Sequence, residues 1–190
     1  MRRKLHRAVF LDRDGTINRE VGNLRSVGQL RILPGVAHAI KELNKLGFLV
    51  IVATNQPVVA RGWVTEKEID AIHAVLVSRL GRRGAKIDAI YYCPHHPEAN
   101  LKKYRLQCRC RKPNIGMIIR ATKGLDVDLR RSFMAGDSTR DILTGKKAGL
   151  KTILIRTGYA GKDGKYAVRA DFTAKNLSQA VKIIKKNAKK

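Results

Sequence analysis

Short apolar runs alternate with helix-like segments along most of this chain of 190 residues. Residues 48–53 (FLVIVA) are apolar throughout, as expected for a strand that helices cover on both faces of a parallel sheet. Such alternation is typical of an α/β domain. The predicted strands are residues 8–11, 48–53, 87–92, 132–135 and 151–155. The pattern therefore predicts a three-layer sandwich around a parallel sheet.

The segments outside the strands show helical periodicity, with apolar residues three or four positions apart. Thr65 and Glu68 form a capping-box pattern ahead of one of these segments. His38 and His73 fall within the helical patterns, and we expect both to be ordinary helix residues. The predicted helices are residues 36–46, 69–80, 115–123, 141–148 and about 177–188.

The composition is strongly basic. Lys and Arg number 40 against 15 Asp and Glu, which gives a formal net charge of +25. This excess points to anionic partners such as phosphate esters, nucleic acid or anionic membrane surfaces. In the C-terminal helix, lysines lie opposite an apolar stripe, which favours a helix docked on the domain; a nucleic-acid-binding tail is the alternative. The lysines are Lys182, Lys185, Lys186, Lys189 and Lys190.

Three cysteines are an odd count, which excludes a fully paired disulfide framework. The apolar stretch at residues 8–11 is too short for a signal sequence and far too short to span a bilayer. We expect one domain over residues 1–190, present as a monomer in the cytoplasm and without a membrane partner.

Two aspartates directly follow the first predicted strand. Asp12 and Asp14 stand where open α/β sheets bind their ligands, and Gly15 permits the sharp turn that follows. Two carboxylates this close ionise together only at a cost, which a divalent cation or one retained proton relieves. The pair therefore suits a nucleophile and a proton carrier, with a solvated turn as the alternative.

Polar residues at other strand ends strengthen this interpretation. Thr54 and Asn55 end the second strand, Asp137 follows the fourth, and Lys112 lies between them in the sequence. Asp137 offers an oxygen ligand for a metal, and Thr54 and Lys112 offer donors for phosphoryl oxygens. Taken singly, each could be an ordinary turn or surface residue.

Four short motifs carry a resemblance to a known superfamily. Residues 12–16 (DRDGT), 54–56 (TNQ), 111–113 (RKP) and 136–141 (GDSTRD) match, in order, the motifs of the haloacid dehalogenase (HAD) superfamily of aspartate-dependent phosphohydrolases. The resemblance covers about residues 8–155. It is strongest to the capless branch with the D-glycero-D-manno-heptose 1,7-bisphosphate phosphatases and the histidinol-phosphate phosphatases. The resemblance implies a Rossmann-like fold without a large cap domain.

The resemblance also implies a mechanism. Asp12 would attack phosphorus and form an aspartyl-phosphate, and Asp14 would protonate the leaving alcohol and then deprotonate the hydrolytic water. Mg²⁺ would be held by the Asp12 carboxylate, the backbone carbonyl of Asp14, and Asp137. Asp141 would orient a water on the metal.

For the substrate, the resemblance implies contacts from Thr54, Asn55 and Lys112 around the transferred phosphate, and from Arg111 beyond it. In this branch the residue after the fourth-motif aspartate is often a lysine that helps bind substrate, whereas this chain has Ser138. The reaction type does not depend on that position, but the choice of substrate does.

All three cysteines lie near one histidine in a polar loop at residues 93–110. Three thiols and one imidazole complete a tetrahedral set for Zn²⁺, and a closed set of this kind predicts a structural role. The predicted ligands are Cys93, His95, Cys108 and Cys110. A Cys108–Cys110 redox pair or inert thiols are alternatives. His96 is a rival ligand that spacing does not exclude, although the resemblance favours His95.

We therefore predict a Mg²⁺-dependent phosphomonoester hydrolase that acts on a small phosphorylated metabolite. The favoured substrate is a heptose 1,7-bisphosphate, and histidinol phosphate is the alternative. A phosphatase of nucleic-acid ends and a basic nucleic-acid-binding module are more distant candidates suggested by the charge. Only 5% of the residues are aromatic, which gives a base-stacking platform little support.

Overall fold

Six parallel strands form one sheet in the computed structural model, which describes residues 5–188. Their order across the sheet is β3-β2-β1-β4-β5-β6, and every neighbouring pair is parallel. The strands are β1 (Ala8–Leu11), β2 (Leu49–Asn55), β3 (Ala89–Cys93), β4 (Phe133–Gly136), β5 (Lys151–Ile155) and β6 (Phe172–Ala174). The five predicted strands are present, and β6 is an addition that sequence patterning missed.

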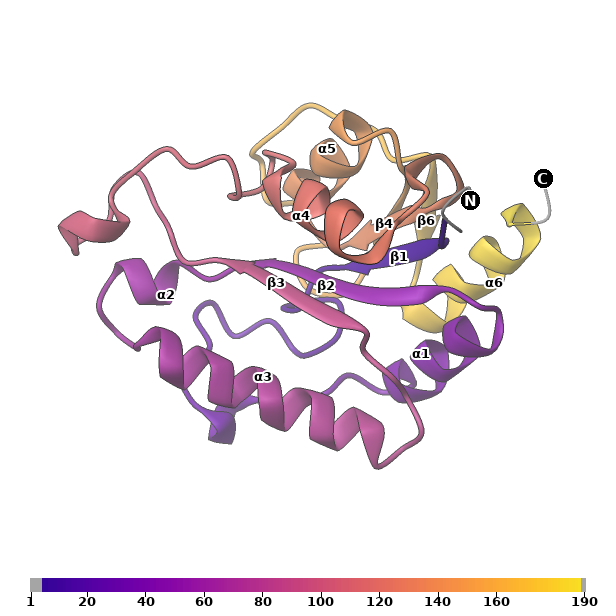
Figure 1. Cartoon of the computed structure of the whole chain (residues 1–190), viewed down its shortest axis with the longest axis horizontal. Coiled ribbons are helices and arrows are strands. Elements are labelled where there is room, and N and C mark those ends of the chain that lie inside the picture. The colour runs from indigo at the N-terminus through magenta and orange to yellow at the C-terminus, as the bar shows by residue number, and fades with distance from the viewer. Residues whose placement is uncertain (1–4, 189–190) are drawn as a thin grey trace.

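Helices cover both faces of the sheet (Figure 1). They are α1 (Val36–Lys45), α2 (Pro57–Ala60), α3 (Glu66–Gly81), α4 (Gly116–Leu125), α5 (Thr139–Lys147) and α6 (Leu177–Asn187), with short 3-10 helices at Val27–Gln29, Lys102–Tyr104 and Leu129–Arg131. The α3 helix begins with the expected capping box between Thr65 and Glu68. The predicted three-layer, Rossmann-like α/β fold is confirmed.

Alternate residues of β1 serve the two cores. Val9 and Leu11 pack in the larger core with α1, α3 and α6, whereas Ala8 and Phe10 pack in the smaller core with α4. This division follows from the two-residue side-chain period of a strand. Because both faces are buried, a continuous apolar run is what a central strand of this sheet requires.

The C-terminal helix α6 lies against α1 (Figure 1). Its buried residues are Leu177, Ala180, Val181 and Ile184, while Lys182, Lys185 and Lys186 are exposed. Lys189 and Lys190 lie outside the described residues, as do the first four residues of the predicted 1–190 domain. Among the helices of residues 5–188, none has the length and apolar character needed to cross a membrane.

The strand order places the chemistry-bearing residues at one edge. Leu11 pairs with Val52 of β2 and with Ala135 of β4, so the carboxyl ends of these three strands lie side by side. Asp12, Thr54 and Asp137 follow these pairs at the same edge, which is where open α/β sheets bind ligands. No inserted domain covers this edge within residues 5–188.

Candidate active site

Lys112 is buried at the centre of the site and holds two carboxylates. Its Nζ lies 2.9 Å from Asp12 Oδ1 and 2.6 Å from Asp141 Oδ1, and donates to the Ala53 carbonyl at 2.7 Å. These three acceptors match the three donors of an ammonium group. Burial disfavours the charged form, but Asp12 and Asp141 keep the pKa of Lys112 above its usual value.

Asp12 carries both of its short contacts on one oxygen. The backbone N–H of Arg13 donates to Asp12 Oδ1 at 2.7 Å, and Lys112 binds the same atom. Burial, supported by the neighbouring carboxylates of Asp141 and Asp14, outweighs Lys112 and raises the pKa of Asp12 to about 6. Asp12 lines the cavity, and within residues 5–188 its Oδ2 atom has no hydrogen bond or ion pair.

Asp14 lies in the opposite kind of environment. Arg13 Nη2 donates to Asp14 Oδ2 at 2.8 Å and to Oδ1 at 3.0 Å, while Asn18 and Gln56 each donate a side-chain N–H at 2.8 and 2.9 Å. Burial opposes ionisation, yet the Arg13 charge and these hydrogen bonds together hold the pKa of Asp14 below its usual range. Asp14 is therefore a carboxylate at neutral pH.

Arg13 also contacts residues of other elements. Its side chain is fully buried, and it donates to Gln56 Oε1 at 2.9 Å and lies 3.1 Å from His73 Nε2 on α3. A guanidinium only donates, so His73 Nε2 is the acceptor and the ring is neutral. Burial and the Arg13 charge lower the pKa of His73 to about 3. His73 is thus part of the site, contrary to the expectation of an ordinary helix residue.

Three carboxylates form a cluster that fits a divalent cation. Asp12, Asp137 and Asp141 each offer an oxygen, and these atoms lie within 4.8 Å of one another. Burial and the charges of Asp12 and Asp141 raise the pKa of Asp137 to about 8. Asp137 Oδ2 accepts from the Tyr159 N–H at 2.6 Å, and a Cβ added to Gly15 or Gly158 would lie 2.1 or 2.0 Å from this atom, so both positions require glycine.

Asp141 has protein partners on both of its oxygens. Oδ1 contacts Lys112, and Oδ2 accepts from the Ser138 N–H at 3.0 Å and the Ser138 hydroxyl at 2.7 Å. Asp141 therefore caps α5 and contacts Lys112, and its expected role in orienting a metal-bound water stays a prediction. The capping also uses the Ser138 hydroxyl.

Thr54 and Asn55 end β2 beside the same cavity. Thr54 is buried, and its hydroxyl oxygen accepts from Gln56 Nε2 at 2.9 Å. The Asn55 amide bonds to both backbone groups of Lys112, donating to its carbonyl at 3.1 Å and accepting from its N–H at 3.0 Å. Asn55 therefore places Lys112 relative to the sheet.

The cavity has a volume of about 400 Å³. The predicted residues Asp12, Asp14, Thr54, Asn55, Arg111, Lys112 and Asp137 all line it. Further cationic side chains, Arg61, Arg140 and Lys165, line it as well. The structure thus gathers every predicted catalytic and substrate-binding residue around one opening. It also adds these basic residues, of which Arg140 lies within the motif at residues 136–141.

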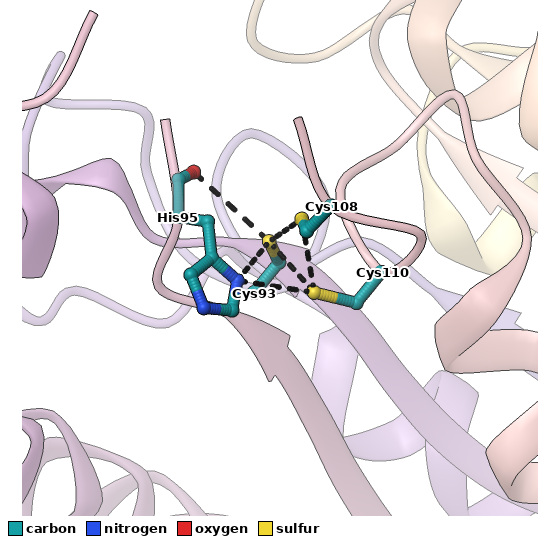
Figure 2. Close-up of side chains that lie close together, drawn as sticks. All are labelled: Cys93, His95, Cys108 and Cys110. Carbon is teal, nitrogen blue, oxygen red and sulfur yellow. Dashed lines mark hydrogen bonds between the residues drawn. The ribbon is translucent and has the colours of Figure 1, made fainter. Parts of the chain in front are cut away.

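The predicted cysteines and histidine form a second cluster (Figure 2). The three Sγ–Sγ distances are 3.1, 3.2 and 3.3 Å, and His95 Nδ1 lies 3.4 Å from Cys110 Sγ and 3.7 Å from Cys93 Sγ. All three thiols are free. Hydrogen bonds from Cys93, Cys108 and His95 outweigh burial and lower the pKa of Cys110 to about 5. A thiolate in a set of sulfur and imidazole ligands suits a metal ion.

His95, and not His96, belongs to this cluster. His96 Nδ1 accepts from the Glu98 N–H at 3.1 Å, and its side chain lines the active-site cavity. The cluster is tied to the cavity through Arg111, whose N–H donates to Cys108 Sγ at 3.2 Å and whose Nη1 donates to the His95 carbonyl at 3.0 Å. The loop therefore positions Arg111.

Comparisons with known proteins agree with this geometry. Residues 109–180 match the family model described as "HAD-hyrolase-like". A D-glycero-beta-D-manno-heptose-1,7-bisphosphate 7-phosphatase of Pasteurella multocida is 38% identical over 183 residues, covering 95% of this chain and 98% of that protein. The one of Rhodopseudomonas palustris is 44% identical over 143 residues, covering 75% and 79%.

Solved structures give the same result. The crystal structure of a D,D-heptose 1,7-bisphosphate phosphatase from B. bronchiseptica, complexed with magnesium and phosphate, superposes with a TM-score of 0.84 at 31% identity. The match covers 96% of this chain and 99% of that one. On the motifs, the fold and these relatives, the chain belongs to the HAD-superfamily phosphatase family that contains the D-glycero-D-manno-heptose 1,7-bisphosphate 7-phosphatases.

Proposed function

We propose that this phosphatase removes the 7-phosphate from a D-glycero-D-manno-heptose 1,7-bisphosphate through a covalent intermediate on Asp12. The observation that carries the proposal is the buried Lys112 ammonium, which contacts Asp12 at the carboxyl ends of three neighbouring strands. Cationic side chains line the cavity at this place. The named activity of relatives at about 40% identity supports the same substrate.

Asp12 is oriented for attack. Lys112 and the Arg13 N–H both bind Oδ1, which leaves Oδ2 to form the bond to phosphorus. Phosphoryl transfer asks mainly for positioning and charge neutralisation, and a fixed carboxylate beside a fixed ammonium supplies both. Thr54 and Lys112 provide donors for the phosphoryl oxygens.

Asp14 carries the proton. Its carboxylate is ionised in the free enzyme, which suits removal of a proton from the water that attacks the aspartyl-phosphate. To protonate the leaving alcohol, Asp14 must first take up a proton. The negative charge of a bound phosphate beside it favours that uptake, because a nearby like charge raises the pKa of a carboxyl group.

The residues present fit a magnesium ion. Asp12, Asp137 and the backbone carbonyl of Asp14 would hold it, because hard oxygen donors are the ligands Mg²⁺ prefers, and the crowded carboxylates need a positive charge. When bound, Mg²⁺ neutralises charge on the phosphoryl oxygens. Gly15 and Gly158 avoid the steric overlap with Asp137 that a side chain at either position would cause.

We further propose that Cys93, His95, Cys108 and Cys110 hold a structural zinc ion. Four protein ligands close the coordination set, and sulfur–sulfur spacings of 3.1–3.3 Å approach the roughly 3.7 Å edge of a tetrahedral site with Zn–S bonds of about 2.3 Å. Because Arg111 is bonded to this loop, loss of zinc should weaken substrate binding while leaving the nucleophile intact.

Metal analysis tests the zinc site. We expect about one zinc per chain, and we expect removal by a chelator to raise KM and lower the melting temperature. Zinc-free protein with unchanged kinetics and an unchanged melting temperature would contradict the proposed coupling.

The charge of the cavity favours a bisphosphate over histidinol phosphate. The cavity is lined by Arg61, Arg111, Arg140 and Lys165 in addition to Lys112. Among the described residues, its acidic lining consists of Glu20 and the three aspartates already discussed, Asp12, Asp14 and Asp137. Histidinol phosphate carries a cationic amine away from its phosphate and would meet repulsion there. A sugar with a second phosphate would meet attraction.

A substrate panel tests the assignment. Phosphate release should be measured with both anomers of heptose 1,7-bisphosphate, histidinol phosphate and a 3′-phosphorylated oligonucleotide, each with and without Mg²⁺. We expect the highest kcat/KM with one heptose bisphosphate anomer, and only with Mg²⁺. A higher kcat/KM on histidinol phosphate or on the oligonucleotide would overturn the substrate assignment.

We also propose that the protein acts as a monomer in the cytoplasm. Three free thiols gathered as metal ligands support a reducing compartment. Sedimentation at micromolar concentration, with and without substrate, tests the monomer directly.

A further inference from the structure

Two guanidinium groups line the same cavity, and within residues 5–188 neither forms a salt bridge with a carboxylate. Arg111 follows the Cys/His loop, and Arg140 lies in the first turn of α5; both are half-buried and both line the cavity. Burial lowers the pKa of Arg111, and the nearby charges of Arg140 and Arg61 add to this effect. Positive charges held this close are a binding site for an anion.

Other cations near the cavity already have partners. Lys112 contacts Asp12 and Asp141, and Arg13 contacts Asp14. By contrast, neither Arg140 nor Lys165 has an ion pair or a side-chain hydrogen bond within residues 5–188. Lys112 and the carboxylate cluster serve the transferred phosphate, so the unpaired cations are available to a different anionic group.

The segment that carries Lys165 is anchored beside Arg140. Thr139, the residue before Arg140, donates its N–H to Asp163 Oδ1 at 2.8 Å and its hydroxyl to Asp163 Oδ2 at 2.9 Å. The Tyr166 N–H donates to the Thr139 hydroxyl oxygen at 3.2 Å. These bonds on either side of Lys165 keep its backbone next to the start of α5.

Ser138 cannot supply charge at this place. It follows Asp137 directly, has no charge, and its hydroxyl donates to Asp141 at 2.7 Å. Two residues further on, Arg140 brings a planar group with five donors, which binds a phosphate through two parallel hydrogen bonds. The cation on this side of the cavity therefore comes from position 140.

We propose that Arg140, with Arg111 and Lys165, binds the second phosphate of the substrate, and that Arg140 thereby selects bisphosphates over monophosphates. This inference rests on the proposed bisphosphatase function and assigns its specificity to a residue of the fourth motif for which the resemblance implies no role. The phosphate that is not cleaved would bridge the two guanidinium groups and relieve their repulsion.

The test compares two substrates in matched variants. Kinetic constants are measured for heptose 1,7-bisphosphate and for heptose 7-phosphate with wild-type protein, R140Q, R140K and R130Q. Arg130 is exposed and precedes β4, at the edge of the sheet opposite the cavity, so R130Q removes the same charge elsewhere. Melting temperatures check that each variant is folded.

We expect R140Q to lower the bisphosphate-to-monophosphate ratio of kcat/KM by roughly 10- to 100-fold, mostly through KM, since charged hydrogen bonds to the uncleaved phosphate are lost. R140K should recover part of that ratio, and R130Q should keep it. As a second variant that does not disturb α5, K165Q should lower the ratio by about three- to tenfold, because Lys165 is exposed and solvent screens it.

The outcomes separate the two claims. Wild-type protein that releases no phosphate from the bisphosphate would overturn the proposed function and this inference together. Wild-type protein that prefers the bisphosphate, with an unchanged ratio in folded R140Q and in K165Q, would overturn this inference alone.

Discussion

Asp12 and Asp14 are two residues apart and line the same cavity, yet their surroundings act in opposite directions. Burial and neighbouring carboxylates raise the pKa of Asp12 to about 6, whereas Arg13 and two amide donors hold the pKa of Asp14 below its usual range. Contrasting environments of this kind separate the roles of paired carboxyl groups. The sequence supplies two like residues, and the packing around them separates the two roles that we propose, nucleophile for Asp12 and proton carrier for Asp14.

The largest expected effect comes from D12N, which removes the nucleophile. We expect kcat to fall by at least about 10,000-fold, because the covalent step has no substitute. The fall should be similar for a sugar phosphate and for p-nitrophenyl phosphate. D12N also relieves the carboxylate crowding, so its melting temperature should not fall. Rates close to those of wild type in purified D12N would refute the assignment.

D14N should lower the catalytic rate less than D12N does, and the size of this loss should depend on the leaving group. Loss of general acid–base catalysis lowers rates by roughly 100- to 1,000-fold. For p-nitrophenyl phosphate, whose leaving group needs no proton, a rapid first turnover should remain and the second step alone should be slow. Stopped-flow measurement of p-nitrophenol release would show this burst. Its absence, with equal losses for both substrates, would remove the distinction between the two aspartates.

His73 acts on Asp14 indirectly, because it contacts Arg13. It can therefore be substituted while both aspartates are left unchanged. We expect H73L to lower kcat by about tenfold with little change in KM, because Arg13 loses an acceptor and Asp14 loses its fixed position. H73Q keeps an acceptor and should recover most of the activity. H38Q is a matched control on α1, where the side chain is exposed. Equal losses in H73L and H73Q would exclude this positioning role.

The same histidine predicts a pH-dependent stability. The pKa of His73 is about 3 in the folded protein and about 6.5 in the unfolded chain, so the unfolded state binds the extra proton as pH falls. Its contribution is complete above pH 6.5 and declines toward pH 3; at pH 5.5 the loss is about 1.4 kcal/mol. Asp12 and Asp137 also titrate in this range, but alike in all three proteins. In urea unfolding, the change in unfolding free energy from pH 7.5 to pH 5.5 should therefore be about 1.4 kcal/mol less favourable in wild type and H38Q than in H73Q. An equal pH dependence in H73Q would place the titrating group elsewhere.

Most of the fold could be predicted because central strands of a parallel sheet are short, apolar and bounded by turns. The β6 strand escaped prediction because it has three residues and only Ala174 among them is buried. The four-residue helix α2 escaped because Pro57–Ala60 is too short to show a helical period. An element that buries few side chains in the core shows little apolar periodicity in its sequence.

The residues of the site likewise divide into those that the sequence predicted and those that it did not. Asp12, Thr54 and Asp137 could be found because strand ends converge at one edge, and the cysteine cluster could be found from its ligand types. Arg13, Gln56 and His73 were missed, since their roles depend on contacts between the β1 loop, the end of β2 and α3. One signal was present for His73, because it lies among the apolar positions 69, 72, 76 and 80 on the buried side of α3. A polar residue at such a position requires a partner.

The two glycines that pack against Asp137 limit which substitutions this enzyme can tolerate. Gly15 and Gly158 come from opposite halves of the chain, both have positive φ, and a methyl group on Gly158 would lie 2.7 Å from the Gly15 Cα as well as 2.0 Å from Asp137 Oδ2. In a saturation library selected for growth, both codons should stay fixed, and no substitution at one should rescue a change at the other. Gly81, with ordinary φ and open space around it, should accept many residues.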